Sequence, residues 1–512
     1  MHGGEDCMAQ RVLSRDDLRI KFGDYNNLKD VLDQVIRDFG HRPAVKYMKG
    51  NEVITRTSDE FFGDIKATAS EFIRMGFYRK HIAIIGKNSY EWLVLYYAAM
   101  YSGCVSVPLS FASPADEVEE LCGYADVEAV FYDEDLTATL NKVRDETGMK
   151  IYEMKAFMAG GYVADRVTED GTIDNRTQKK DVATIMFTSG STGKSKGVML
   201  SNESFWANFV TLEYRSDSCL LILPLHHVAT LTVANAYLGD AAELHIGDDP
   251  KQFVKYVSIM QSEATFVVPA LLSVITTRLK KVDYDIKKLG WKLDHLLCGG
   301  ATFPSGVISQ LSKTGISIQQ YYGTTELCGG LICGIMSDDN PTTIGDDIAY
   351  TMEATIIDGE LCAHGSRMFS GYYKDEEGTN EVLYDGWYHT GDLARVDDKG
   401  NWYLTGRKKN LIILDNGENI SPEEIETKLG ICPDIAEVVV YGEGSFLHAE
   451  ILPAFDIDAS EESRQATRDR ITAFVDNYNS NAAIYKRVPF TEFRDTPFEK
   501  NAAGKIQRPA RG

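Results

Sequence analysis

A short run of hydroxyl-bearing residues, glycines and lysines is the part of this sequence best suited to chemistry. The run is Thr188-Ser189-Gly190-Ser191-Thr192-Gly193-Lys194-Ser195-Lys196-Gly197, and it follows an apolar stretch over 183–187 with the composition of a buried strand. Glycines let the main chain approach a ligand closely, N–H and hydroxyl groups bind phosphate oxygens, and lysines supply positive charge. We therefore predict a polyphosphate-binding loop, with a solvated linker as the alternative that this composition also allows.

The spacing narrows the class of phosphate loop. A Walker loop requires a glycine, four further residues and then Gly-Lys-Ser/Thr, whereas here Thr188 occupies the position of the first glycine. The run instead resembles the phosphate-binding signature of the acyl-adenylate-forming (AMP-binding) superfamily, Thr-Ser-Gly-Ser/Thr-Thr-Gly-x-Pro-Lys-Gly, with Ser195 in place of the proline. N-terminal segments such as 87–92 and 107–109 resemble in particular the bacterial fatty-acyl-CoA synthetases of that superfamily.

Two further motifs extend the resemblance to the nucleotide. In Tyr322-Gly323-Thr324-Thr325-Glu326, which follows a predicted strand over 316–319, the resemblance implies that Tyr322 packs on adenine, Thr325 contacts the α-phosphate and Glu326 holds Mg²⁺. Gly299-Gly300-Ala301 resembles the family's Gly-Gly-Ala stretch beside the adenine and the acyl group. Either motif alone could also be an ordinary turn after a strand.

A third pair of motifs concerns the ribose and a hinge. Tyr388-His389-Thr390-Gly391-Asp392-Leu393 resembles the family's ribose-binding signature, in which Asp392 would accept hydrogen bonds from both ribose hydroxyls. In Gly406-Arg407-Lys408-Lys409 the resemblance implies that Arg407 also reaches the ribose and that Lys409 is the hinge of a small domain. An exposed basic turn is the alternative for Lys408 and Lys409.

The C-terminal part carries the last two motifs. Asn416 to Glu426 resembles the family's Gly-x-Asn-Val-x-Pro-x-Glu-Ile-Glu segment, with Ser421 as an N-cap and Pro422 at the first helical position. Asn501 to Arg508 resembles the motif Thr-x-x-Gly-Lys-x-x-Arg, in which Lys505 matches the catalytic lysine. The family's threonine is replaced by Asn501 or Ala502, so a merely solvated lysine is the alternative.

Hydrophobic patterning predicts how these motifs are held. Helical periodicity, as over 29–38 and 203–213, alternates with apolar strand-like runs, as over 81–86 and 219–224, as far as residue 268, which is typical of a parallel sheet. Short alternating strands follow residue 341, and a separate α+β module follows residue 409. We predict an α/β fold in which a large N-terminal domain, 1–408, combines layered α/β subdomains with a small β-rich region. A small, mobile α+β domain, 409–512, would carry the catalytic lysine.

The composition excludes several classes of protein. The net charge of −23 argues against nucleic-acid binding, and nine scattered cysteines fit neither a zinc pattern nor a disulfide framework. No apolar run approaches the ~18 residues of a membrane span, and the N-terminus lacks the features of a signal peptide. We therefore expect a cytoplasmic protein with free, buried thiols and no transmembrane segment.

The resemblance implies a two-step ligase reaction. A carboxylate attacks the α-phosphate of MgATP to give an acyl-adenylate and pyrophosphate, and a thiol then displaces AMP. Thr188, His227, Glu326 and Lys505 are the predicted catalytic residues, with ATP, Mg²⁺ and coenzyme A as cofactors. The phosphopantetheine of a separate acyl carrier protein is the alternative acceptor. A P-loop-like NTP hydrolase and a non-catalytic ATP-binding protein are remote alternatives.

The acid itself is predicted from the residues after His227, which matches a family histidine at the mouth of the acyl site. Residues 228–234 contain no acidic side chain, which argues against a free amino acid as substrate. They are apolar, as are Leu271, Leu272, Val274 and Ile275, and Gly329-Gly330 could leave room for an acyl chain. We expect a medium- or long-chain fatty acid, with an aryl acid as the alternative. An ordinary core position is the alternative for His227.

Overall fold

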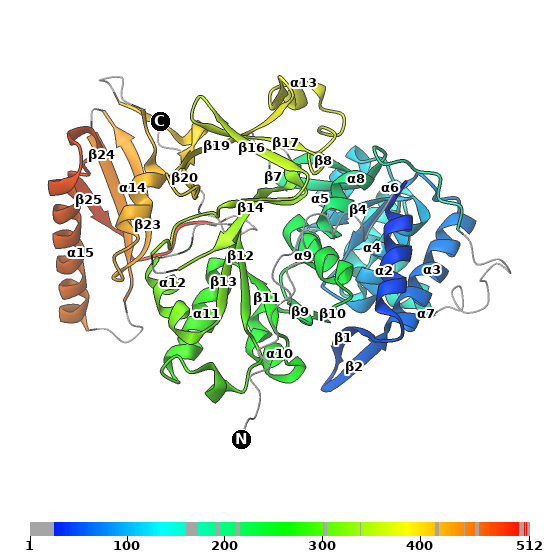
Figure 1. Cartoon of the computed structure of the whole chain (residues 1–512). Coiled ribbons are helices and arrows are strands. Elements are labelled where there is room, and N and C mark those ends of the chain that lie inside the picture. Colours follow the sequence, from blue (N-terminus) through cyan, green and yellow to red (C-terminus); the bar gives the residue numbers. More distant parts are fainter. Residues whose placement is uncertain are drawn as a thin grey trace.

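The structure is a computed structural model of the 512-residue chain (Figure 1). It describes residues 25–159, 173–189, 195–209, 216–300, 303, 305–337, 339–414, 419–444, 446–455, 460–500, 506 and 508. Two large sheets with their helices and a small β-sheet form the N-terminal part, and a smaller sheet-and-helix unit lies beside them at the C-terminal end (Figure 1). Among the described residues, no helix combines the length and apolarity needed to cross a membrane.

A six-stranded sheet forms one layer of the N-terminal part. Its strands are parallel, except that the edge strand β8 runs antiparallel to β7. Alternate residues of β3 face opposite sides, so Ile82 and Ile84 pack with α3 and α4 whereas Ala83 and Ile85 pack with α5 and α6. In sheet order the strands are β6 (Lys150–Glu153), β5 (Val127–Tyr132), β3 (His81–Ile85), β4 (Val105–Leu109), β7 (Val182–Ser189) and β8 (Ser195–Ser201). The helices are α2 (Leu28–Phe39), α3 (Ser58–Arg74), α4 (Tyr90–Ser102), α5 (Ala115–Tyr124), α6 (Thr137–Thr147) and α7 (Met154–Ala159).

A nine-stranded sheet forms the second layer. Its central strands are parallel, and both of its ends are antiparallel. In sheet order the strands are β15 (Asp347–Ile348), β14 (Gly329–Ile335), β13 (Ser317–Thr324), β12 (His295–Gly299), β11 (Ala264–Val267), β9 (Ser218–Leu221), β10 (Glu243–Ile246), β1 (Pro43–Lys49) and β2 (Glu52–Thr57). One face of this sheet packs against α10 (Phe253–Met260), α11 (Pro269–Lys280) and α12 (Ser305–Leu311). The core on its other face includes α8 (Asn202–Phe209) and α9 (Val228–Gly239).

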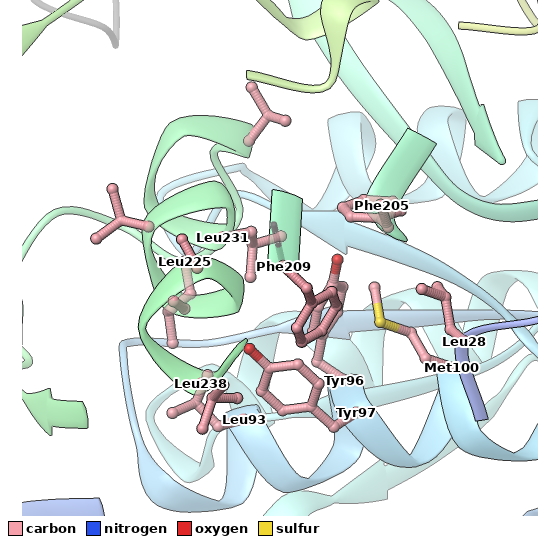
Figure 2. Packing of buried hydrophobic residues seen from close by; sticks show 14 of the residues in the cluster. Leu28, Leu93, Tyr96, Tyr97, Met100, Phe205, Phe209, Leu225, Leu231 and Leu238 are labelled. Atoms are coloured by element: carbon pink, nitrogen blue, oxygen red, sulfur yellow. The ribbon is translucent and has the colours of Figure 1, made fainter. Parts of the chain in front are cut away.

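The main core lies where the two layers meet. Figure 2 shows side chains of α4, α8 and α9 packed together there, among them Tyr96, Phe209 and Leu231. Every residue of α4 except Glu91 is buried, which agrees with its apolar composition on all sides. The Tyr97 hydroxyl donates to Asn235 Oδ1 at 2.9 Å and thereby ties α4 to α9. This contact fixes the helix that begins next to the predicted acyl-site histidine.

Two smaller units complete the chain. The β-rich unit contains α13 (Glu376–Asn380) and the strands β16 (Met352–Ile357), β17 (Glu360–Gly365), β18 (Leu383–Tyr384), β19 (Trp387–Val396) and β20 (Trp402–Arg407). The C-terminal unit contains β21 (Ile412–Ile413), β22 (Asn419–Ile420), α14 (Pro422–Leu429), β23 (Ile435–Glu443), β24 (Phe446–Pro453), α15 (Glu461–Asn481) and β25 (Phe490–Phe493). As predicted, the Ser421 hydroxyl caps α14 by accepting from Glu424 N, and Pro422 is the first helical residue. The α/β fold class is confirmed, with a large N-terminal part of sheets and helices and a small C-terminal unit.

The predicted elements are confirmed with three differences. The two described ends of the phosphate run, 188–189 and 195–197, belong to the paired strands β7 and β8, because β8 runs antiparallel to β7 instead of being part of a loop. The strand predicted over 219–224 ends at Leu221, and β13 extends through the Tyr322 motif to Thr324. The helix predicted over 203–213 is described as far as Phe209, and its remaining residues lie outside the described part.

The thiols agree with the prediction of free, buried cysteines. All eight cysteines among the described residues are buried and unbridged. Burial raises the pKa of Cys104 and Cys122 to about 12, which keeps these groups as inert thiols. Cys7 lies outside the described residues.

Candidate active site

A cavity of about 1100 Å³ connects the two large sheets with the β-rich unit. One side is polar and contains several of the predicted nucleotide residues, namely Thr188, Lys196, Gly300, Gly323, Thr324, Thr325, Glu326 and Arg407. The other side is apolar and is formed by α9, β11, β14 and their neighbours. Its walls include Val228, Ala229, Val233, Ala236, Phe266, Val268, Leu331, Ile332 and Ala349. A single cavity therefore presents polar groups to one part of a ligand and apolar walls to another.

The β7–β8 hairpin supplies the phosphate end of this cavity. Thr188 and Lys196 are directly paired across the hairpin, so their side chains project from the same face of the ribbon. The Lys196 ammonium lies 3.9 Å from Asp375 Oδ2 and 4.5 Å from the centre of the Tyr372 ring. Ser189 and Ser195 form the last pair, and Gly190 to Lys194 lie outside the described residues. The hairpin therefore brings a hydroxyl and an ammonium to the cavity wall, as a phosphate site requires.

The predicted magnesium residue lies close to this hairpin. Glu326 is in a short 3₁₀ turn, η5 (Thr325–Leu327), directly after β13. Its Oε1 accepts a hydrogen bond of 2.9 Å from the Tyr372 hydroxyl. Among the described residues, no three His, Cys, Asp or Glu side chains cluster as a metal cage. Mg²⁺ commonly uses one or two carboxylates together with substrate phosphates and water, so Glu326 fits such a site.

A buried hydroxyl supports phosphate binding at the same place. Thr324 Oγ1 is buried at the cavity wall beside the Tyr388 side chain, and it forms no hydrogen bond of good geometry within the described part of the chain. A buried polar atom without a partner costs free energy, about 1–3 kcal/mol. A phosphate oxygen of a nucleotide bound in the cavity would satisfy this hydroxyl.

The structure brings together three of the predicted adenosine residues. Asp392 on β19 pairs in register with Arg407 on β20, and Arg407 Nε lies 2.6 Å from Asp392 Oδ1. The Tyr322 hydroxyl donates to Asp392 Oδ2 at 2.7 Å, and burial together with Asp392 raises the pKa of Tyr322. Asp392 is only 3% exposed, and of the two adjacent tyrosines it is Tyr321 that lines the cavity. The stacking of Tyr322 on adenine and the binding of ribose by Asp392 stay predictions.

A second carboxylate supports the ribose turn from behind. Glu360 on β17 accepts from Gly391 N at 2.7 Å and from Lys408 Nζ at 2.9 Å. Although burial opposes ionisation, the Lys408 ammonium and the Gly391 N–H hold the pKa of Glu360 below its usual value. Gly391 has φ +74°, a conformation that favours glycine. Glu360 thus connects the turn before Asp392 with the residue next to the predicted hinge, Lys409, which also lines the cavity.

The two histidines before α9 mark the acid side. Asn88 holds the preceding loop, since its amide donates to Leu223 O at 2.9 Å and its Oδ1 accepts from Leu225 N at 2.9 Å. Burial lowers the pKa of His226 to about 3 and also lowers that of His227. His227 lines the cavity, and at neutral pH its ring carries no charge. It can therefore form a hydrogen bond there without adding a positive charge to the cavity.

One expectation about the predicted acid side is wrong, and a second is wrong for one of its two residues. Leu271, Leu272 and Ile275 belong to the core between α11 and the nine-stranded sheet, and none of them lines the cavity. Val274 is 43% exposed on the opposite face of α11. Gly329 and Gly330 both line the cavity, but a Cβ at Gly329 would collide with Thr232, whose side chain fills this space. At Gly330 the nearest atom to a Cβ would be Tyr321 Cδ1 at 3.4 Å, so the room expected there stays a prediction. The absence of a side chain at Gly329 lets α9 approach β14 closely.

Comparisons with known proteins agree with this geometry. A family model described as AMP-binding enzyme matches residues 32–373, and one described as AMP-binding enzyme C-terminal domain matches residues 409–511. The chain belongs to the AMP-binding enzyme family. It is 26% identical to a 2-succinylbenzoate–CoA ligase of Bacillus cereus (83% of this chain, 86% of the relative). It is 25% identical to the long-chain-fatty-acid–CoA ligase FadD15 of Mycobacterium bovis (76% and 75%).

A solved structure extends the likeness to the fold. The o-succinylbenzoate CoA synthetase of Bacillus subtilis, in complex with its acyl-adenylate intermediate, superposes with a TM-score of 0.75 at 21% identity, over 94% of this chain and 97% of that one. The predicted family is therefore confirmed. At the level of the AMP-binding enzyme family, the predicted enzyme class, acid–thiol ligase, is also confirmed, since the named relatives are CoA ligases. A further solved structure of the Bacillus subtilis synthetase, at 21% identity, contains ATP and a magnesium ion, in agreement with the predicted cofactors.

Some predicted residues of this AMP-binding enzyme lie outside the described part of the chain. These are Gly190, Ser191, Thr192, Gly193, Lys194, Ala301 and Lys505, and the side chain of Ser189. The structure also reveals site residues that the sequence motifs did not indicate, namely Glu360, Tyr372 and Arg367. Tyr372 contacts the predicted residue Glu326 through a hydrogen bond, and Glu360 accepts hydrogen bonds from Gly391 and Lys408, the neighbours of Asp392 and Lys409. All of these contacts span a long sequence separation. A single sequence carries no spacing signal for such contacts.

Proposed function

We propose that this AMP-binding enzyme activates a carboxylic acid with an apolar body, in the first place a medium- or long-chain fatty acid, and transfers the acyl group to coenzyme A. The supporting observation is the single cavity that joins Thr188, Lys196 and Glu326 to apolar walls around α9. Relatives named as fatty-acyl-CoA ligases and as a 2-succinylbenzoate–CoA ligase support the reaction class.

In the first step, a carboxylate oxygen attacks the α-phosphorus of ATP, and the bond to pyrophosphate breaks. Both reactants are anions, so the site must neutralise charge and align the groups. Thr188, Lys196 and Thr325 would bind phosphate oxygens, and Asp392 with Arg407 would hold the ribose. Bound at Glu326, Mg²⁺ would neutralise phosphate charge. Lys505, outside the described residues, would bridge the carboxylate and the α-phosphate.

In the second step, a thiol sulfur attacks the acyl carbon and AMP leaves with the bonding electron pair. We include in the proposal the division of the chain into domains 1–408 and 409–512, and rotation of the second domain about Lys409. This rotation would withdraw Lys505 and admit the thiol, and hinge residues in enzymes absorb such changes. His227, neutral at the cavity wall, would lie beside the acyl carbon.

An aryl acid that carries a polar substituent is a second candidate, because one cavity wall is cationic. Arg367 is fully buried at this wall, and its guanidinium donates to Ala207 O at 2.8 Å and to Gly330 O. Burial lowers its pKa to about 10, so it remains positively charged at neutral pH. A polar substituent of an aromatic acid would gain from this charge, whereas a plain fatty chain would not.

The test is pyrophosphate release with MgATP against fatty, aryl and amino acids, with and without coenzyme A. We expect release that depends on a fatty acid, and acyl-CoA when coenzyme A is present. Release only with aryl acids would support the second candidate. Adenylate formation without thioester would point to a separate carrier protein as acceptor. Phosphate release without an acid would contradict the proposal.

A further inference from the structure

The segment Phe369–Tyr373 connects the phosphate hairpin with the turn that carries Glu326. On one side, Ser370 N donates to Met199 O at 2.8 Å and Met199 N donates to Gly371 O at 3.0 Å, which joins the segment to β8. On the other side, Phe369 N donates to Glu326 O at 2.7 Å. The segment therefore forms main-chain hydrogen bonds with both of the elements that bear the predicted phosphate and metal groups.

The side chain of Tyr372 contacts a functional group on each of these elements. Its hydroxyl donates to Glu326 Oε1 at 2.9 Å, and its ring centre lies 4.5 Å from the Lys196 ammonium. The ring is buried, at 7% exposure, and its main-chain N–H donates to Thr379 Oγ1 at 2.8 Å.

This geometry suits a group that orients others without touching the reacting atoms. A hydroxyl that donates to Oε1 restricts the rotation of the Glu326 carboxylate and leaves Oε2 available to a metal ion. Hydrogen bonds of this kind to metal-binding carboxylates commonly change metal affinity or activity by 10–100-fold. The ring face attracts the Lys196 ammonium at the same time, which keeps this cation near the cavity.

We propose that Tyr372 is a positioning residue that aligns the metal-binding carboxylate of Glu326 and the phosphate-binding ammonium of Lys196 for the same MgATP. The inference rests on the adenylation site proposed above. The Tyr372 hydroxyl acts on Glu326 and the Tyr372 ring acts on Lys196, so the two effects can be separated by substitution.

The adjacent tyrosine provides a matched control. The Tyr373 hydroxyl donates to Asp126 Oδ2 at 2.7 Å on an exposed surface, and Tyr373 does not line the cavity. Tyr373→Phe thus removes a tyrosine–aspartate hydrogen bond one residue away without changing the site. Tyr372→Phe removes the hydroxyl that binds Glu326 and keeps the ring under Lys196.

The experiment measures metal binding directly, without turnover. Mn²⁺ replaces Mg²⁺ as a spectroscopic probe, and its affinity is titrated by electron paramagnetic resonance in the presence of ATP and without acid. We expect Tyr372→Phe to weaken Mn²⁺ binding about 10-fold and to leave ATP binding without metal unchanged. Tyr372→Leu should in addition weaken ATP binding without metal, and Tyr373→Phe should match the wild type.

A double-mutant cycle tests whether the effect passes through Glu326. In a Glu326→Gln background, Tyr372→Phe should cause no further loss of Mn²⁺ affinity. If Tyr372→Phe does not fold, Tyr372→His, which keeps a ring N–H donor, takes its place and should bind Mn²⁺ nearly as the wild type does. Wild-type affinity in Tyr372→Phe, or an equal loss in the Gln background, would overturn the role of Tyr372. If the wild type itself shows no metal-dependent ATP binding, the proposed adenylation site is wrong instead.

Discussion

The two sides of the cavity are built in different ways. On the proposed nucleotide side the carboxylates are held by other named groups, as Asp392 is by Arg407 and Tyr322, and as Glu326 is by Tyr372. On the acid side, apolar walls from α9 and β14 pack by shape. Hydrogen bonding requires particular side chains at particular positions, whereas apolar packing accepts many residues of similar volume. The reaction class can therefore be predicted from sequence motifs, whereas the identity of the acid cannot.

The largest effect should come from the predicted lysine of the first step. Lys505→Ala should lower adenylate formation by at least about 100-fold, because transition-state charge would be left unbalanced. It should spare thioester formation from a supplied acyl-adenylate, and the loss should be equal for every acid. Pyrophosphate release and thioester formation are measured separately. The control is Lys500→Ala, since Lys500 pairs with Glu437 at 2.6 Å. Equal loss in both steps would contradict this role.

Asp392→Asn should give the next largest effect, confined to the nucleotide side. The substitution removes a charged acceptor, and hydrogen bonds to charged groups contribute about 1.5–3 kcal/mol, so we expect KM for ATP to rise about 10- to 100-fold. The ranking of acids should not change. Asp397→Asn is the control, because Asp397 accepts from Asn401 and Tyr403 in a nearby turn. A changed preference among acids would break the proposed separation of the two sides.

Ala229→Leu should act only on the acid side. Ala229 is partly exposed and lines the cavity, so a larger side chain should shorten or narrow the space for the acid. We expect kcat/KM for the longest acids to fall about 10-fold relative to short ones, with KM for ATP unchanged. The matched control is Val274→Leu, on the exposed face of α11. An altered acid ranking in this control would reinstate α11 as part of the acyl site.

The smallest effect concerns stability and pH. The pKa of His226 is lowered to about 3 in the folded protein, while the unfolded chain binds a proton near pH 6.5. Stability is therefore unaffected above pH 6.5 and falls as the pH drops from 6.5 towards 3. The free energy of unfolding should fall between pH 7 and pH 5.5 by about 1 kcal/mol less in His226→Gln than in the wild type, as measured by urea unfolding. An unchanged pH dependence in the variant would show that His226 is not protected by burial.

The sequence predicted the elements well because apolar periodicity is local. The regular pattern of 29–38 and the apolar run of 81–86 became α2 and β3. The strand β8 (Ser195–Ser201) was not predicted, because its first three residues belong to the polar, glycine-containing run that was assigned to a loop. Leu271 was wrongly assigned to the acyl site because an apolar residue of a helix is equally suited to a core and to a cavity wall. The hydrogen bond from Tyr372 to Glu326 spans 46 residues and depends on the tertiary fold.

The buried thiols have a practical consequence for following the small domain. The described cysteines are all buried, and burial raises the pKa of Cys104 and Cys122 to about 12, so maleimide dyes should react with them slowly in the folded protein. With Cys7→Ser, one new cysteine on the solvent side of α15 and a second on the exposed surface of α13 would give a donor–acceptor pair on an otherwise silent background. Fluorescence transfer between these two sites would then test the proposed rotation of the domain 409–512 in single molecules during turnover.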